Sequence, residues 1–134
     1  MVNTFKNVKN EILATLKENS FELGIQAGAI IEAGNETSDA IPMPFVYCDF
    51  DYGTALVVGG YVCDLEVNIF IGCENASVGE AKEDADVIAS KILKILLEKN
   101  LIKINTDDKF KEFFSESSQR AGIRLILKSE IISH

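Results

Sequence analysis

The chain has 134 residues, 47% of them apolar, and its 21 acidic and 13 basic side chains give a formal net charge of −8. This length suits one domain with one core, and no apolar run approaches the roughly 20 residues that span a bilayer. Nucleic-acid binders and proteins of anionic membrane surfaces rely on clustered Lys and Arg, so the charge argues against both classes. Residues 1–7 lack the sections of a secretory signal, which predicts a cytoplasmic origin.

The first third of the chain predicts one helix followed by a less regular segment. Asn3 and Thr4 can cap a helix that ends near Asn19. Its apolar stripe consists of Phe5, Val8, Ile12, Leu13 and Leu16. Gly24, Gly28 and Gly34 disfavour a long helix in residues 21–34. The alternation of apolar residues there can be interpreted as short strands. The polar and proline-containing segment 34–44 is expected to be the most mobile loop.

The middle of the chain predicts a hairpin. Residues 45–50 have the aromatic and β-branched composition of a strand, and Asp51-Tyr52-Gly53 is interpreted as a turn. Residues 55–58 precede Gly59-Gly60, which suits a tight hairpin turn into the next strand. In that next strand the apolar side chains alternate with polar or small ones. They are Leu65, Val67, Ile69, Ile71 and Cys73.

A long amphipathic helix is predicted after this strand. Ser77 stands three residues before Glu80, the spacing of a capping box. The apolar positions that follow recur at steps of three and four, which predicts a helix that covers one face of a sheet. They are Ala81, Ala85, Ile88, Ile92, Ile95 and Leu96.

The last third predicts a short helix and a final strand. Asp107 and Asp108 precede phenylalanines at helical spacing, which predicts a helix over 108–116. The row Phe110, Phe113 and Phe114 is interpreted as core, with an exposed partner-binding patch as the alternative. Residues 123–131 alternate as a strand, and the charges on its second face predict an edge strand. Its apolar row could meet another subunit. The predicted interface residues are Ile123, Leu125, Leu127 and Ile131.

These elements together predict an α+β fold in which residues 1–134 form a single domain. The sheet is expected to be mixed or mainly antiparallel, with the long helix packed on one face and a leading N-terminal helix.

Candidate catalytic chemistry is sparse. Four carboxylates could gather at one end of the sheet and bind Mg²⁺ or Ca²⁺. They are Asp49, Asp51, Asp64 and Glu66. Metal-dependent nucleases often carry a lysine two positions after such an acid, whereas Asn68 follows Glu66, so solvated acids are the preferred interpretation.

Other sites are equally unsupported. The cysteines, Cys48, Cys63 and Cys73, lack metal-site spacing and are interpreted as small core residues, with a reactive or paired thiol as the alternative. The single histidine, His134, is the last residue, so a hydrolase base is missing, and no phosphate-loop motif occurs. We therefore expect no catalytic residue, cofactor or metal.

The order of elements resembles the tail-terminator or tail-completion proteins and the related minor tail proteins of Mu-like bacteriophages. The proline-led strand 45–50, the alternating strand 65–71 and the helix 80–98 carry the resemblance, which covers residues 4–98. Residues 21–34 and the C-terminal strand have no counterpart.

This resemblance implies a non-enzymatic virion subunit that forms a ring, possibly a hexamer, between the tail tube and the head connector. Such a protein would assemble in the host cytoplasm and end in the virion tail. The alternatives are a cytoplasmic α+β binding or adaptor module and a metal-dependent hydrolase or nuclease.

Overall fold

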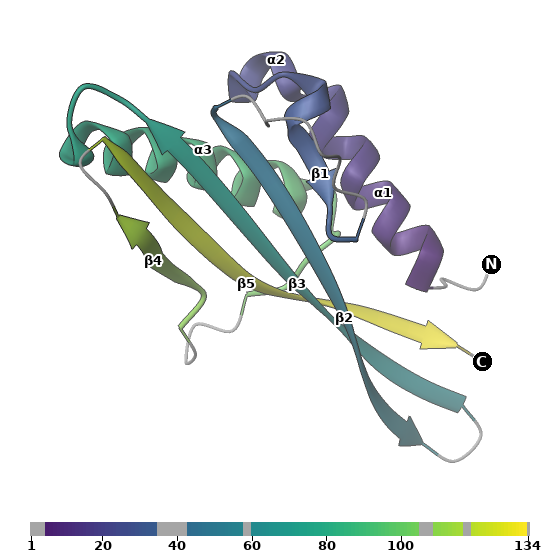
Figure 1. Ribbon diagram of the computed structural model, residues 1–134. Helices are drawn as coiled ribbons and strands as arrows, with labels where there is room; N and C mark the ends of the chain where they lie inside the picture. Colours follow the sequence, from purple (N-terminus) through teal and green to yellow (C-terminus); the bar gives the residue numbers. More distant parts are fainter. Residues whose placement is uncertain (1–4, 35–42, 58–59, 105–108, 117–118, 134) are drawn as a thin grey trace.

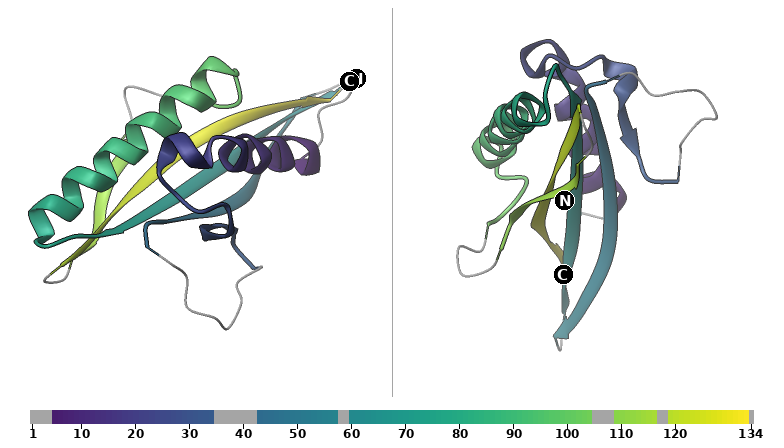
Figure 2. Two further views of the ribbon diagram at one scale, coloured as in Figure 1. Left: turned by 90° about the horizontal axis from the view of Figure 1, so that it is seen from above. Right: turned by 60° about the vertical axis from the view of Figure 1, so that its left-hand side comes forward.

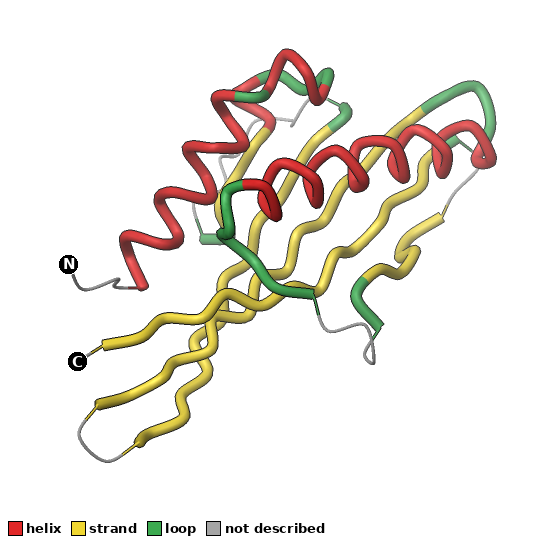
Figure 3. The backbone as a smooth tube through the Cα atoms, turned by 180° about the vertical axis from the view of Figure 1, so that it is seen from behind, coloured by secondary structure: helices red, strands yellow, loops and turns green. Residues whose placement is uncertain are grey.

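The computed structural model describes residues 5–34, 43–57, 60–104, 109–116 and 119–133. It is an α+β fold with one mixed sheet and two long helices, α1 (Phe5–Glu18) and α3 (Val78–Glu98), as predicted. Figure 1 shows the strands running side by side, and Figure 3 shows both helices on the same face of the sheet. None of the described helices is long and apolar enough to cross a membrane.

The sheet has five strands in the order β1-β2-β3-β5-β4. Strand β1 runs parallel to β2, and the other neighbours are antiparallel. The strands are β1 (Ile30–Glu32), β2 (Phe45–Val57), β3 (Gly60–Glu74), β4 (Lys111–Glu116) and β5 (Arg120–Ser133). The two edges of the sheet are therefore β1 and β4.

Strands β2 and β3 form the predicted hairpin, with Val57 opposite Gly60. Gly60 begins β3, and the proposed turn residue Gly59 lies outside the described residues. The turn expected at Asp51-Tyr52-Gly53 is wrong, because β2 continues through it and Asp51 pairs with Glu66. A strand tolerates these polar residues here because Asp51 lies on the face that no helix covers.

The core lies between the sheet and the two helices. The predicted row Leu65, Val67, Ile69 and Ile71 is completely buried and belongs to one cluster with Ile92 and Leu96 of α3. Ser77 caps α3 as predicted, since its Oγ accepts a hydrogen bond from the Glu80 amide at 3.2 Å. The polar side of α3 faces outward, so the helix covers the sheet with its apolar stripe.

Helix α1 joins this core beside α3. Val8, Ile12 and Leu16 are buried, and Lys9 Nζ lies 2.6 Å from Glu32 Oε1 on β1. The predicted end near Asn19 is confirmed, whereas the cap residues Asn3 and Thr4 lie outside the described residues.

The ambiguous segment 21–34 contains a short helix and a short strand. Helix α2 (Ser20–Leu23) ends at Gly24, whose φ of 71° is the left-handed conformation that favours glycine. A 3₁₀ turn (Ala27–Ala29) leads into β1. The strand interpretation therefore holds for Ile30–Glu32 and is wrong for 21–25. Most of the loop predicted to be mobile lies outside the described residues.

Two predictions for the C-terminal third are wrong. The segment expected as a helix over 108–116 contains strand β4, since Phe113 pairs with Ile123 in a ladder along β5. The final strand is not an edge: β5 lies between β3 and β4. Its charged residues Arg124 and Lys128 mark the uncovered face of the sheet instead of its edge.

The long strands extend past the helices. In Figures 1 and 3 the far end of the β2–β3 hairpin and the end of β5 project beyond α1 and α3. The backbone ladder continues through this projection, where Cys63 pairs with both Thr54 and Ile131. Figure 2 shows the same strands curving away from the helix layer.

Candidate functional site

The sheet face opposite α1 and α3 is the first candidate surface, because no described helix lies over it (Figure 3). The strand register identifies the side chains that share this side, which we call the open face. They are Tyr47, Asp49, Asp51, Glu66, Asn68, Phe70, Glu112, Arg124, Ile126 and Lys128. Aromatic and charged residues therefore alternate with the buried apolar residues of the same strands.

A polar network occupies the centre of the open face. Arg124 Nε and Nη2 donate hydrogen bonds to Asn68 Oδ1 at 3.1 and 2.8 Å. The third guanidinium nitrogen, Nη1, lies 3.4 Å from Glu112 Oε1, and Asn68 Nδ2 donates to Glu66 Oε1 at 3.3 Å. Asn68 is only 6% exposed, so these partners satisfy a nearly buried amide.

Aromatic rings flank this network. The guanidinium carbon of Arg124 lies 5.6 Å from the centroid of Phe70, within cation–π range. The Tyr47 and Phe70 rings meet edge to face with centroids 6.0 Å apart. Protein interfaces are enriched in arginine and aromatic residues, and the strongest contributors are held rigidly near the centre. The centre of the open face therefore carries arginine and aromatic residues of the kind that protein interfaces favour, within a surface of charged side chains.

The carboxylates proposed as a metal site are partly brought together. Asp49, Asp51 and Glu66 all lie on the open face, and Asp51 is directly opposite Glu66 in the ladder. Asp64 pairs with Gly53, and its side chain lies outside those described. Within the described residues, no three His, Cys, Asp or Glu side chains are arranged to hold a metal ion. The acids instead contribute negative charge to the β2 side of this face.

The described cysteine side chains fit the interpretation as core residues. Cys48 and Cys73 are buried free thiols. Burial raises the pKa of Cys48 to about 12 and that of Cys73 to about 11, with nearby carboxylates adding to both shifts. Because a thiolate is the nucleophile, both groups are unreactive at neutral pH. The side chain of Cys63 and the terminal His134 lie outside the described residues.

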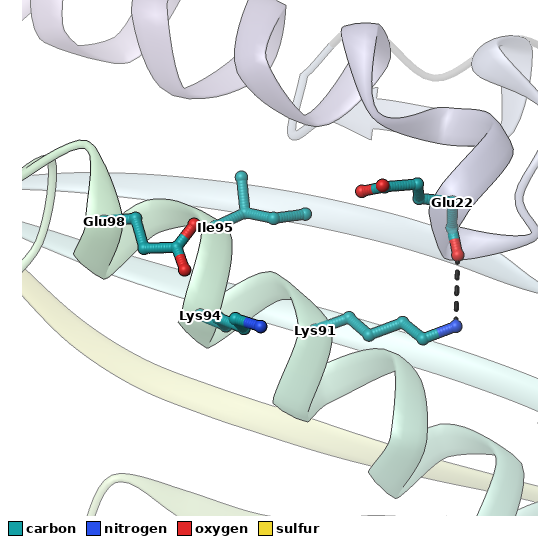
Figure 4. Close-up of a pocket in the computed structure, with 5 residues that line it drawn as sticks. All are labelled: Glu22, Lys91, Lys94, Ile95 and Glu98. Atoms are coloured by element: carbon teal, nitrogen blue, oxygen red, sulfur yellow. Dashed lines mark hydrogen bonds between the residues drawn. The ribbon is translucent and has the colours of Figure 1, made fainter.

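Two grooves lie beside α3 on the helix side of the molecule. The first, of about 400 Å³, is lined by Glu22, Lys91, Lys94, Ile95 and Glu98 (Figure 4). Lys91 Nζ bridges it by donating to the Glu22 carbonyl at 3.1 Å. Two acidic and two basic side chains therefore surround the single apolar residue of this groove, Ile95.

The second groove, of about 260 Å³, lies between α2 and the N-terminal half of α3. The buried side chains of Leu23, Cys73 and Ile88 form its apolar floor. Met43 and Val87 at its mouth are 37% and 53% exposed. Glu74, Asp84 and Lys91 also line it, so a charged rim surrounds an apolar interior.

The residues predicted as an interface have a structural role in the monomer. Ile123, Leu125 and Leu127 are at most 1% exposed and lie in the core on β5. Ile131 pairs with Cys63, and its side chain is outside those described. Their contact with another subunit stays a prediction.

Sequence reasoning missed the Arg124 network and the second groove. Arg124 stands between the apolar residues Ile123 and Leu125, which indicates a polar face but not its partner. The contact with Asn68 depends on the β3–β5 register across 56 residues of chain, for which no local signal exists.

Of the phenylalanine row, Phe113 is 50% exposed, Phe110 is half-buried, and the Phe114 side chain is outside those described.

Comparison with known proteins gives one informative finding. No family model and no curated protein matches the sequence. A chain in the structure entitled "Virion of native gene transfer agent (GTA) particle" has the same fold, with a TM-score of 0.67 at 12% identity. The likeness covers 91% of this chain and 92% of that one, so it extends over nearly all elements of both.

Proposed function

We propose that this chain is a non-enzymatic structural subunit of a phage-type virion, working as a tail terminator, tail-completion or head-tail joining protein. The observation that carries the proposal is the likeness in fold, over 91% of this chain, to a chain of a gene transfer agent virion. It agrees with the resemblance of 4–98 to phage tail-terminator proteins.

The composition of the surface supports a role through protein contacts. The open face places Arg124 between Phe70 and Asn68 at the centre of a charged surface. Such an arrangement suits recognition of another protein, because rigid aromatic and arginine side chains lose little entropy on binding. Its residues are positioned by four adjacent strands, β2, β3, β5 and β4, which give firm support for an interface.

In the proposed role, copies of the chain form a ring, for example a hexamer, with one side on the last ring of the tail tube and the other on the head connector. The net charge of −8 affects this assembly. Repulsion between like subunits keeps the free protein monomeric at low salt, while higher ionic strength or a tail template favours association.

Light scattering coupled to size exclusion, run across salt and protein concentration, tests the proposal. The expected result is a shift from monomer to one defined oligomer as salt rises, or on addition of tail tubes. A strict monomer at high concentration in low and high salt, without binding to tubes, would favour the adaptor alternative.

A further inference from the structure

We infer that copies of this chain associate head to tail, with Phe113 of one copy inserted into the groove between α2 and α3 of the next. The inference rests on the proposed function, because it names the contact that would build the ring. The occupant of the groove is a second copy of this chain.

The donor surface surrounds Phe113 on the edge strand β4. The ring is 50% exposed, and Lys82 Nζ lies 5.3 Å from its centroid. Lys111, two residues earlier on the same face of β4, contacts Asp86 Oδ1 through its Nζ at 2.6 Å, which ties β4 to α3. Phe113 is therefore held on a fixed element, presented to solvent and flanked by the ammonium groups of Lys82 and Lys111.

The acceptor surface is the second groove described above. Its apolar floor of Leu23, Cys73 and Ile88 and its volume of about 260 Å³ suit one aromatic ring. Val87, at the mouth, is 53% exposed, so an inserted ring would cover apolar surface on both partners.

The charges of the two surfaces are complementary. Three exposed acidic residues of α3 lie seven, four and three residues before Val87. This spacing puts them on the same face of the helix as Val87. They are Glu80, Glu83 and Asp84. Asp84 also lines the groove itself, together with the acidic Glu74 and the basic Lys91. The donor surface opposes them with Lys82 and with Lys111, which is paired with Asp86, so its net charge is positive. Glu74 and Lys111 already belong to exposed ion pairs, which are weak and can be exchanged on association.

The positions of the two surfaces make the contact head to tail. Lys82 and Asp86 lie on the side of α3 that meets β4, whereas Lys91, about two and a half turns beyond Lys82, lies on the groove side. The donor and acceptor are therefore on opposite flanks of one rigid helix and cannot meet within a single chain. A contact between different surfaces of identical subunits closes into a ring when the rotation permits.

Two variants separate the surfaces. Phe113→Asp removes the donor ring and leaves the groove intact, while Val87→Lys places a cation at the groove mouth and leaves Phe113 intact. Each variant alone is expected to weaken association about thirtyfold or more in sedimentation velocity under conditions where the parent assembles. Mixed in equal amounts, they should form one heterodimer and nothing larger, because each complex retains only one functional contact.

Leu97→Lys is the matched control. Leu97 is 42% exposed on the same helix and lies outside both surfaces, so this variant should assemble like the parent. Circular dichroism melts within a few degrees of the parent confirm that the exposed substitutions keep the fold.

The outcomes distinguish the two proposals. If the parent forms a defined oligomer and both variants form it equally well, the inference is wrong and the proposed function stands. The inference is also wrong if the mixture stays monomeric although each variant is folded. A parent that is strictly monomeric at every salt concentration and on tail tubes overturns both.

Discussion

The assignment of the covered and open faces can be tested by truncating one isoleucine on each. Ile69 on β3 is 0% exposed and lies between Cys48 and Leu125 in the ladder, beneath the helices. Ile69→Ala deletes three buried carbon groups, which at about 0.8 kcal/mol each gives about 2.4 kcal/mol. The unfilled cavity raises the expected loss to about 3–4 kcal/mol, within the usual range of about 2–5 kcal/mol for such a change.

Ile126 on β5 is the matched control, because Ile126→Ala makes the same deletion on the open face, where the side chain is only half-buried. Its cost should be about 1 kcal/mol, since less apolar area leaves water there. Urea denaturation followed by circular dichroism gives both values, and the melting temperature of Ile69→Ala should fall by about 12 °C. Equal losses for the two variants would contradict the assignment of the faces.

Three further predictions concern the open face, the thiols and metal binding. Arg124→Met should cost about 1–3 kcal/mol in urea denaturation, because Asn68 would lose two hydrogen bonds in a nearly buried site; a loss below about 0.5 kcal/mol would show that the network is not structural. The pKa of Cys48 is raised from 9.0 to about 12 in the folded chain, so the unfolded chain releases this proton first and stability should fall as pH rises above about 9; Cys48→Ala should flatten that fall in pH-dependent urea melts, and an unchanged slope would refute the shift. Millimolar Mg²⁺ should leave the melting temperature unchanged, whereas a rise of several degrees that is lost in Glu66→Ala would restore the metal-site alternative.

The helix and strand at the centre of the fold are predictable because their signals are local and agree with one another. The Ser77–Glu80 cap, the helical stripe that follows it and the alternation through Val67 and Ile69 each indicate one structure over many residues. Long periodic segments leave few alternatives, which is why α3 and β3 match the prediction closely.

The short segment with Phe110 and Phe113 is predicted wrongly because its pattern suits two structures. Their spacing of three fits one helix face, but in the folded chain Phe113 lies on β4 close to Lys82 of α3, whereas Phe110 precedes β4 and accepts a hydrogen bond from the Ile126 amide through its carbonyl oxygen. Pairing with β5 decides between the two. That pairing is a tertiary contact and leaves no local signal in so short a stretch.

The position of β5 shows a similar limit. Charge at Arg124 and Lys128 suits the protection of an edge, yet the same pattern arises in a central strand whose second face is uncovered. The placement of the helices decides between an edge strand and a central strand with one uncovered face. Both α1 and α3 lie on the same face of the sheet, so the other face stays uncovered. The candidate surfaces depend on this arrangement, so neither the Arg124 network nor the groove could be read from the sequence.

Native mass spectrometry of the parent chain, at protein and salt concentrations that promote association, tests the central claim most directly. A closed ring predicts a single oligomeric mass that dominates over all intermediates and stops growing as concentration rises. A continuous series of dimers, trimers and larger species, or a monomer at every concentration, would contradict it.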